Sequence, residues 1–155
     1  LVTEQGQSIR FPESEIRATS RDTSGVRGIQ LAKGDRVVGM DVMPPNSELL
    51  IVTSLGYGKR THEEEYRRQS RAGSGVTTIK LTEKTGHVVA SRVVTSSDTD
   101  LMLVASDGLV IRQPLDTVRV YGRSTQGISL MNLSHGATVV SLSVIGEGPD
   151  GDEID

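Results

Sequence analysis

Arginine recurs at matched positions in this sequence, and these arginines are the residues best suited to bind a partner. Two sets of three share the spacings 50 and 52: Arg10, Arg60 and Arg112, then Arg21, Arg71 and Arg123. A guanidinium is a permanent cation with five donors in a fixed fork, which suits phosphate and carboxylate groups. Regularly spaced cations favour an extended polyanion, because its affinity grows with the number of phosphates contacted.

The segment from residue 59 to residue 75 concentrates positive charge. It ends on Gly73 and Gly75, and glycine lets backbone amides approach an anion closely. Arginine together with exposed amides is what phosphate binding requires. The predicted contacts to nucleic acid are Arg21, Lys59, Arg60, Arg67, Arg68, Arg71, Arg112 and Arg123. A structural role, in which the recurring arginines bond to carbonyl groups of a neighbouring repeat, explains the same pattern, and the sequence leaves both open.

The sequence shows no arrangement typical of catalysis. It contains no cysteine, which excludes thiolate chemistry and disulfides. His62, His87 and His135 occupy unrelated positions in the repeat, so their spacing builds no metal site. No serine lies in a nucleophile-elbow pattern. We therefore expect no catalytic residue, no metal and no cofactor in this chain.

Glycines at the same spacings frame the arginines and indicate the elements that position them. Gly6, Gly56 and Gly108 each precede the first arginine of a repeat by four residues, and Gly25, Gly75 and Gly127 each follow the second by four. Aromatic residues make up only 3% of the chain. The core must therefore come from aliphatic side chains, and the β-branched ones among them favour strands.

Each repeat predicts four short strands separated by turns. The patterns are an alternating stretch (27–31, 77–81, 129–133), a Val-Val-led strand (37–38, 88–89, 139–140), an apolar run (49–53, 101–105) and a hairpin strand that ends at Arg60 or Arg112. The continuous apolar runs indicate strands buried on both faces. Four strands in about fifty residues are typical of a propeller blade. We predict an all-β, propeller-like fold of about three four-stranded blades over residues 1–146, forming a partial disc.

The acidic residues are unevenly distributed. Five of the 20 follow Gly146, so the rest of the chain carries 15 acidic against 17 basic residues. Residues 147–155 are predicted to be an acidic, disordered tail. No apolar run approaches the length of a membrane span, and the first ten residues do not resemble a signal peptide. A cytoplasmic, nucleoid-associated location is expected, without membrane contact.

Three stretches together resemble the C-terminal domain of the DNA gyrase A subunit. They are residues 25–29 (Gly-Val-Arg-Gly-Ile), residues 56–61 (Gly-Tyr-Gly-Lys-Arg-Thr) with Glu65 and Tyr66, and residues 122–128 (Gly-Arg-Ser-Thr-Gln-Gly-Ile). The resemblance extends to about Ile145 and matches the later blades of that domain. It implies a β-pinwheel, a disc whose blades exchange strands with their neighbours.

The resemblance also implies a function. Such a disc bends double-stranded DNA around a basic rim to support ATP-dependent negative supercoiling. It acts in an A2B2 assembly with the B subunit, beside the remainder of the A subunit. The family's signature box, Gln-Arg-Arg-Gly-Gly-Lys-Gly, has only a degenerate counterpart in residues 69–75. Gln69, Arg71, Gly73 and Gly75 match it, whereas Ser70, Ala72 and Ser74 do not.

Two alternatives remain open at this point. The related C-terminal domain of the topoisomerase IV A subunit shares the blade but resembles these motifs less. A propeller that docks another protein is compatible with the modest net charge of residues 1–146.

Overall fold

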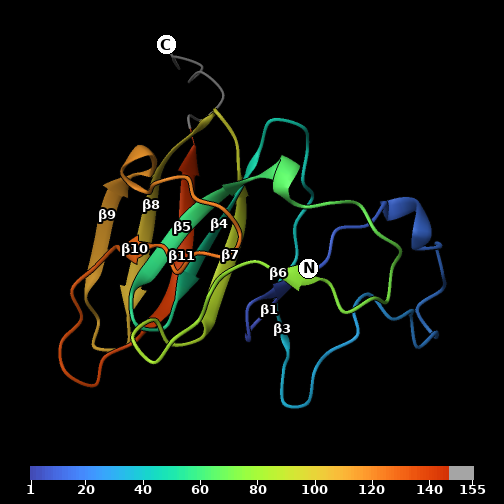
Figure 1. Cartoon of the computed structure of the whole chain (residues 1–155), viewed down its shortest axis with the longest axis horizontal. Helices are drawn as coiled ribbons and strands as arrows, with labels where there is room; N and C mark the ends of the chain where they lie inside the picture. The colour runs from blue at the N-terminus through green and yellow to red at the C-terminus, as the bar shows by residue number, and fades with distance from the viewer. Residues whose placement is uncertain (147–155) are drawn as a thin grey trace, which may run out of the picture.

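Three antiparallel sheets, one for each repeat, stand side by side in the computed structural model of this protein, which describes residues 1–146 (Figure 1). The predicted acidic tail lies outside the described residues. We refer to residues 1–46, 47–97 and 98–146 as units 1, 2 and 3. Sheet 1 has the strand order β3 (Val37–Gly39), β1 (Val2–Thr3), β2 (Gln7–Ser8) and β6 (Val76–Thr77). Sheet 2 has the order β10 (Ile128–Ser129), β5 (Tyr57–His62), β4 (Glu48–Thr53) and β7 (Val88–Val94). Sheet 3 has the order β11 (Val139–Gly146), β8 (Asp98–Ala105) and β9 (Val110–Pro114).

The fourth strand of a sheet comes from the following unit. Strand β6 belongs to unit 2 but pairs with β2, where Val76 faces Ser8. Strand β10 belongs to unit 3 but pairs with β5, where Ile128 faces Gly58. The predicted four-stranded blade is therefore confirmed for sheets 1 and 2. Sheet 3 has three strands among the described residues, and β9 forms its edge.

Glycines allow the exchanged strands to approach closely. Gly75 and Gly127 each precede a donated strand and have φ values of +78° and +76°. A Cβ atom on Gly75 would overlap the carbonyl oxygen of Ser8, and one on Gly127 would overlap that of Gly58. Both the left-handed backbone and the close contact exclude a larger residue. The repeat of these glycines thus follows from the packing of one unit onto the next.

Two hydrophobic cores lie between the sheets. One joins sheets 1 and 2 and includes Leu49 and Ile51, and the other joins sheets 2 and 3 and includes Leu50 and Val52. These four residues alternate along β4, and successive side chains of a strand point to opposite faces. Strand β4 is therefore buried on both faces, as its apolar run predicts, because sheet 2 lies between the other two.

Strand β8 departs from the prediction that both apolar runs are buried on two faces. Leu101, Leu103 and Ala105 are buried, but Met102 and Val104 are only half-buried. Sheet 3 is the last of the run, and among the described residues no further sheet covers its outer face. The apolar run of β8, residues 101–105, resembles that of β4, residues 49–53, so the position of sheet 3 at the end of the three sheets causes the difference in burial.

The alternating stretches form less strand than predicted. Strands β6 and β10 each contain two residues, and residues 27–31 contain none. Ile29, Ile79 and Met131 are nevertheless buried, so the alternation reflects side-chain burial. The backbone of these stretches pairs only where a neighbouring unit offers a strand, β2 to β6 and β5 to β10.

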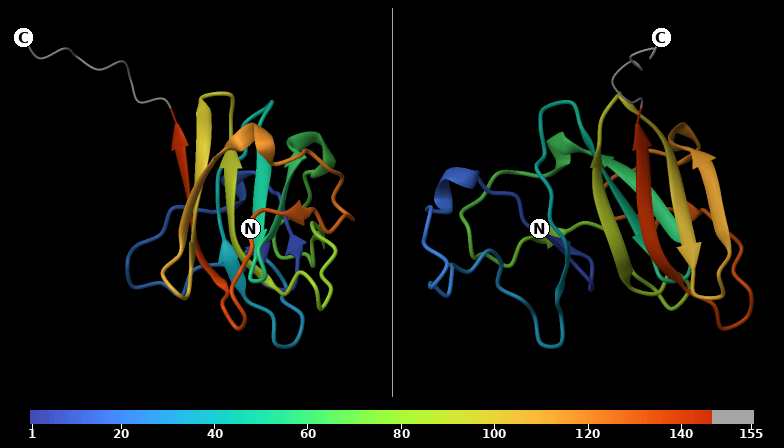
Figure 2. Two further views of the ribbon diagram at one scale, coloured as in Figure 1. Left: turned by 90° about the vertical axis from the view of Figure 1, so that its left-hand side faces the viewer. Right: turned by 180° about the vertical axis from the view of Figure 1, so that it is seen from behind.

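Three one-turn 3-10 helices connect the hairpins to the arginine-rich loops: η1 (Glu13–Glu15), η2 (Glu63–Glu65) and η3 (Leu115–Thr117). They lie along one side of the molecule in Figure 1, and again when it is seen from behind in Figure 2. Within residues 1–146 no helix has the length and apolar character needed to cross a membrane.

Candidate nucleic-acid interface

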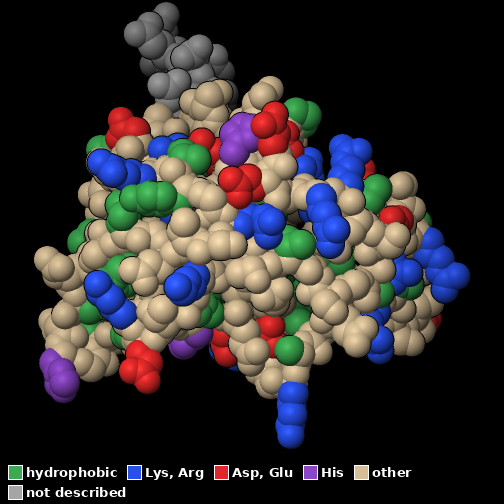
Figure 3. All heavy atoms as spheres, in the orientation of Figure 1, with side chains coloured by type: hydrophobic (Ala, Val, Ile, Leu, Met, Phe, Trp, Pro, Cys, Tyr) green, Lys and Arg blue, Asp and Glu red, His purple; other side chains and the backbone are tan. Residues whose placement is uncertain are grey.

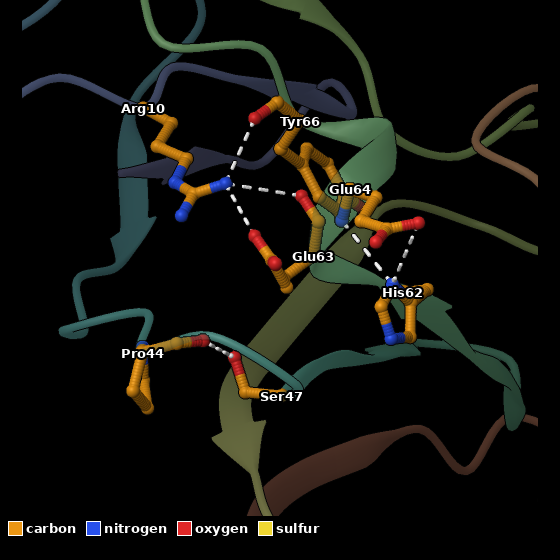
Figure 4. Close-up of polar contacts among 7 residues, drawn as sticks. All are labelled: Arg10, Pro44, Ser47, His62, Glu63, Glu64 and Tyr66. Carbon is orange, nitrogen blue, oxygen red and sulfur yellow. Dashed lines mark hydrogen bonds and ion pairs between the residues drawn. The ribbon is translucent and has the colours of Figure 1, made fainter.

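Arg10 joins unit 1 to unit 2. Its Nη1 donates to the Glu63 carboxylate at 2.6 Å and to the carbonyl oxygens of Glu63 and Tyr66, both at 3.1 Å. Figure 4 shows the guanidinium pointing at the turn η2, with all three acceptors on the following unit. The turn is held from its other end by His62, whose Nδ1 accepts from the amide of Glu64. Arg10 therefore fixes the position of a turn.

Arg60 repeats this contact between units 2 and 3. Its Nε donates to the carbonyl oxygen of Val118 at 2.7 Å, and its Nη1 donates to the Glu48 carboxylate at 2.6 Å. Arg112, at the matched position in unit 3, pairs with Asp100 at 2.7 Å. Asp100 lies 52 residues after Glu48, so this ion pair also belongs to the repeat.

The second set of arginines bonds in the opposite direction, to the preceding unit. The Arg71 amide donates to the Glu15 carboxylate at 2.7 Å, and its guanidinium donates to the carbonyl oxygen of Arg27. The Arg123 amide donates to the Glu65 carboxylate at 2.9 Å, and its guanidinium to the carbonyl oxygen of Thr77 at 2.9 Å. Arg21 belongs to unit 1 and is exposed.

These contacts support the structural alternative for the recurring arginines. Arg10, Arg60, Arg71 and Arg123 all bond to the backbone of an adjacent unit and are half-buried. A guanidinium has five donors, so these bonds leave donors available to a phosphate, although the charges of Arg10 and Arg60 are already paired with Glu63 and Glu48. A direct contact of Arg60, Arg71 or Arg123 with nucleic acid stays a prediction.

Lys59 is placed inside the protein. It is fully buried, and its Nζ donates to the carbonyl oxygens of Gly122 (2.6 Å) and Arg123 (2.8 Å) and to the Thr125 hydroxyl (3.2 Å). Burial lowers the pKa of Lys59 to about 8; Glu65 opposes this shift and the nearby Arg123 adds to it. Isoleucine holds the matched positions 9 and 111. Lys59 therefore anchors a loop of unit 3 and presents no surface to a polyanion.

The box-like loop, residues 69–75, is packed against unit 1. The amides of Gln69 and Ala72 donate to the carbonyl oxygens of Arg10 and Gly28, both at 2.9 Å. The carbonyl oxygen of Gly73 accepts from the amide of Gln30 at 2.9 Å. These backbone groups hold the loop in place, so they are not available to a phosphate.

Exposed cations are the remaining candidates for a nucleic-acid contact. Arg21, Arg67, Arg68 and Arg112 from the predicted set are exposed. Sequence reasoning missed a third matched set, Arg17, Arg67 and Arg119, of which only Arg67 was selected. All three side chains are exposed, and each residue follows the residue that ends a 3-10 turn. The spacings 50 and 52 that reveal the other two sets reveal this one as well.

The face of the molecule drawn in Figure 3 is of mixed charge. Figure 3 shows Lys and Arg spread from one end of this face to the other, with Asp and Glu between them. Among the described residues no group of three or more His, Asp or Glu side chains could hold a metal ion. Tyr66, whose pKa is raised by burial, is enclosed in the core and bonded to Thr78 at 2.6 Å, so it is not placed to react with a ligand.

A known family matches the chain in three segments. The profile described as "DNA gyrase C-terminal domain, beta-propeller" matches residues 1–42, 47–95 and 99–145. These segments correspond to units 1, 2 and 3. The predicted repeat and its propeller-like class are therefore confirmed by an independent comparison.

Similar proteins and solved structures agree with this match. The chain is 43% identical over 153 residues to the DNA gyrase A subunit of Dehalogenimonas lykanthroporepellens, covering 95% of this chain and 19% of that protein. It is 41% identical over 152 residues to the DNA gyrase A subunit of Staphylococcus aureus strain MRSA252, covering 97% of this chain and 17% of that protein. The chain thus spans under one fifth of these relatives.

The solved structures show the same architecture. A DNA gyrase A C-terminal domain superposes with a TM-score of 0.85 and 31% identity, covering 92% of this chain and 48% of that one. The C-terminal domain of a DNA topoisomerase IV superposes with a TM-score of 0.86 and 22% identity, covering 94% of this chain and 45% of that one. The second likeness concerns the fold alone.

Proposed function

The chain belongs to the DNA gyrase C-terminal domain family, and on that premise we propose that it is a non-catalytic module that binds the backbone of double-stranded DNA. The observation that supports this most is the exposed set Arg17, Arg67 and Arg119. One cation stands beside each 3-10 turn, and the three turns lie along one side of the molecule. Their recurrence suits the phosphates of a duplex that passes successive units.

Exposed neighbours extend this row. Arg68 follows Arg67 directly, and Arg21 and Arg112 are exposed in units 1 and 3. Arg60, Arg71 and Arg123 lie deeper. Arg71 and Arg123 contribute positive charge behind the surface, Arg60 is paired with Glu48, and Lys59 positions the loop that carries Arg123. The contact is therefore phosphate-dominated and largely independent of base sequence, and it weakens steeply with salt.

Bending of the DNA follows from such a row. A duplex that follows several units must curve, and smooth bending of a short site by 40–90° costs on the order of 1–6 kcal/mol. Many weak phosphate contacts must offset this cost. With only a degenerate box at residues 69–75, we expect this chain to bind DNA weakly and to support wrapping started elsewhere in the domain.

The setting of this activity is the gyrase holoenzyme. We propose that the chain acts as part of a gyrase A subunit, with the B subunit in an A2B2 assembly, to support ATP-dependent negative supercoiling. This role would place it in the cytoplasm, on the nucleoid. The identities favour gyrase over topoisomerase IV, since the superposed gyrase A domain is 31% identical to this chain and the superposed topoisomerase IV domain 22%.

The test is a mobility-shift titration of a linear duplex over a series of salt concentrations. The triple variant R17Q/R67Q/R119Q removes the exposed row and leaves the bonded arginines intact. Each lost phosphate contact should reduce the slope of log K against log salt by about 0.9. Affinity at low salt should fall by a similar amount for duplexes of different sequence.

A matched control removes the same charge elsewhere. Lys33, Arg36 and Lys84 are exposed, and Arg36 is paired with Glu4 at 2.6 Å. The turns 33–34 and 83–85 lie at the end of the molecule opposite to the 3-10 turns (Figure 1). The variant K33Q/R36Q/K84Q should keep the slope of the unmodified chain. An equal loss in both variants would mean that only net charge matters, and no DNA binding by the unmodified chain at low salt would contradict the proposal.

A further inference from the structure

Two of the exposed cations lie in short segments that are bonded to the preceding unit. Arg67 lies in residues 66–69 of unit 2, and Arg119 lies in the matched residues 118–121 of unit 3. Each segment begins with the residue that ends a 3-10 turn, and that first residue is buried. The exposed arginine thus directly follows a residue whose side chain is fixed in a hydrophobic core.

Arg10 of unit 1 bonds to both ends of the first segment. Its Nη1 donates to the carbonyl oxygen of Tyr66 at 3.1 Å, and its own carbonyl oxygen accepts from the amide of Gln69 at 2.9 Å. Figure 4 shows the guanidinium pointing at Tyr66. Arg67 lies between these two bonds, so one residue of unit 1 holds the backbone on both sides of it.

Arg60 of unit 2 bonds to the second segment in the same way. Its Nε donates to the carbonyl oxygen of Val118 at 2.7 Å, and its carbonyl oxygen accepts from the amide of Tyr121 at 2.8 Å. The amide of Arg60 also donates to the carbonyl oxygen of Arg119 at 3.0 Å. These bonds hold the backbone of the exposed cation itself and of its neighbours on both sides.

Charge separates the holding arginines from the exposed ones. Arg10 and Arg60 each pair with a carboxylate at 2.6 Å, and their side chains are only 19% and 18% exposed. Arg67 and Arg119 are exposed. An exposed cation can neutralise a phosphate and release counterions, whereas the charge of a paired one is already balanced. The two sets therefore have the surroundings of different tasks.

We propose that Arg10 and Arg60 are positioning residues for the binding of DNA phosphates. Arg10 determines where Arg67 lies. Arg60 does the same for the exposed arginine of unit 3, Arg119. The inference rests on the proposed function, because it assigns a role in the same phosphate contact.

Positioning of this kind raises affinity without a new contact to DNA. A cation on a backbone that is already ordered loses less conformational freedom on binding than one on a loose loop. Because each holding arginine belongs to the preceding unit, it also fixes the exposed cation relative to that unit. A row of cations on successive units matches a row of phosphates only when the position of each cation is defined in this way.

Nitroxide labels test the positioning without DNA. The chain has no cysteine, so the variants R67C and R119C each offer one thiol for a label. In the electron paramagnetic resonance spectrum, R60M should make the label at position 119 more mobile and leave the label at position 67 unchanged. R10M should do the reverse. The crossed pairs are the matched controls, because a general loosening of the protein would mobilise both labels in both variants.

The salt dependence of duplex binding tests what the positioning does. R119Q should lower the slope of log K against log salt by about 0.9, the value of one phosphate contact. R60M should lower the slope by part or all of this amount, and it should add nothing in the R119Q background. In the R67Q background, the effect of R60M should remain, because the two act on different cations. R10M and R67Q should form the same non-additive pair.

A second variant covers a failure of R60M to fold, which circular dichroism would reveal. R60K keeps a cation for Glu48 but has no Nε to donate to the carbonyl oxygen of Val118. It should mobilise the label at position 119 with a smaller loss of stability than R60M.

Three results would overturn the inference, and only the last of them also contradicts the proposed function. Label spectra that do not change in the uncrossed pairs would show that the holding arginines do not position the exposed ones. An additive loss of slope in R60M/R119Q would show that Arg60 contacts a phosphate itself, and a slope that responds to R119Q but not to R60M would show that its position is immaterial. A slope unaffected by both R67Q and R119Q would remove the exposed cations from the DNA contact.

Discussion

Two junctions join the units, one between units 1 and 2 and one between units 2 and 3. They share the same backbone contacts but differ in the side chain that packs under the joining loop. At both, a strand led by glycine joins the preceding sheet, and an arginine bonds to the next unit. At the junction of units 1 and 2, Ile9 lies under the loop that contains Gly73, 3.7 Å from the position of a Cβ atom on that glycine. At the junction of units 2 and 3, the Lys59 ammonium lies under the loop that contains Gly122. The backbone contacts define the junction, and the side chains that fill it can change from apolar to ionic.

The largest expected effect concerns the glycines that both junctions share. Gly75→Ala and Gly127→Ala each strain a left-handed backbone and press a Cβ against a carbonyl oxygen, so the free energy of unfolding should fall by roughly 2–5 kcal/mol. Gly25→Ala is the matched control, because it has the backbone strain without the contact, and should cost about 1–2 kcal/mol. Urea unfolding measures all three. Equal losses at the three positions would contradict the role assigned to the close approach.

The next effect distinguishes the three arginines of the first set. Arg10→Met and Arg60→Met leave a carboxylate and at least one carbonyl oxygen without their donor, so each should destabilise the chain by about 1.5–3 kcal/mol. The loss of stability should be larger for Arg10→Met, since all three acceptors of Arg10 lie on the next unit. Arg112→Met should change the unfolding free energy by less than about 1 kcal/mol, because the Arg112 side chain is 60% exposed and its pair with Asp100 is therefore open to water on one side. Thermal melting of the three variants tests this order.

Lys59 makes the stability of the junction between units 2 and 3 depend on pH. Ile9, at the matched position between units 1 and 2, has no titratable group. The pKa of Lys59 is about 8 in the folded protein, below the ordinary value of 10.5. Between these values the unfolded chain binds a proton that the folded chain has lost, so the unfolding free energy rises with pH. The slope from this group is at most about 1.4 kcal/mol per pH unit. Urea titrations from pH 7 to pH 10 should show this rise in the unmodified chain, and Lys59→Met should lack it.

The smallest effect lies within unit 2. Tyr66→Phe removes the hydrogen bond to the buried Thr78 hydroxyl and should cost about 1 kcal/mol. Unit 3 has Val118 and Leu130 at the two matched positions, so it fills the same place with apolar groups. The double variant Tyr66→Phe/Thr78→Val should therefore recover most of the loss. Urea unfolding of the single and double variants checks this, and an additive loss would contradict it.

The sequence predicted the fold well because its strongest signals are repeated. Each pattern, whether glycines at fixed spacings, Val-Val pairs or apolar runs, has one structural cause. Because the pattern recurs from unit to unit, each unit is separate evidence for that cause. Burial of β8 was overestimated, since an apolar run does not show whether another sheet covers it. The short length of β6 and β10 could not be predicted either, because it depends on the strand that the neighbouring unit offers for pairing.

The candidate site was less predictable for a physical reason. Recurrence of an arginine shows that its position matters, but a bond to a carbonyl oxygen and a contact to a phosphate require the same guanidinium. The basic segment predicts Lys59 as a nucleic-acid contact, but Lys59 is fully buried, and its three acceptors come from a loop more than sixty residues away. Arg17 and Arg119 can be found from the sequence alone, by applying the spacings 50 and 52 to every arginine.

The exchange of strands between units has a consequence for synthesis on the ribosome. Strand β5 ends at His62, but the strand that completes its sheet begins at Ile128, 66 positions later. At about 5–20 residues per second, β5 waits roughly 3–13 seconds with an open edge after it has been made. Sheets 1 and 2 are thus each finished by a segment translated well after the rest of the sheet, and an elongation pause between His62 and Ile128 would prolong the time in which a nascent chain can pair with the wrong neighbour.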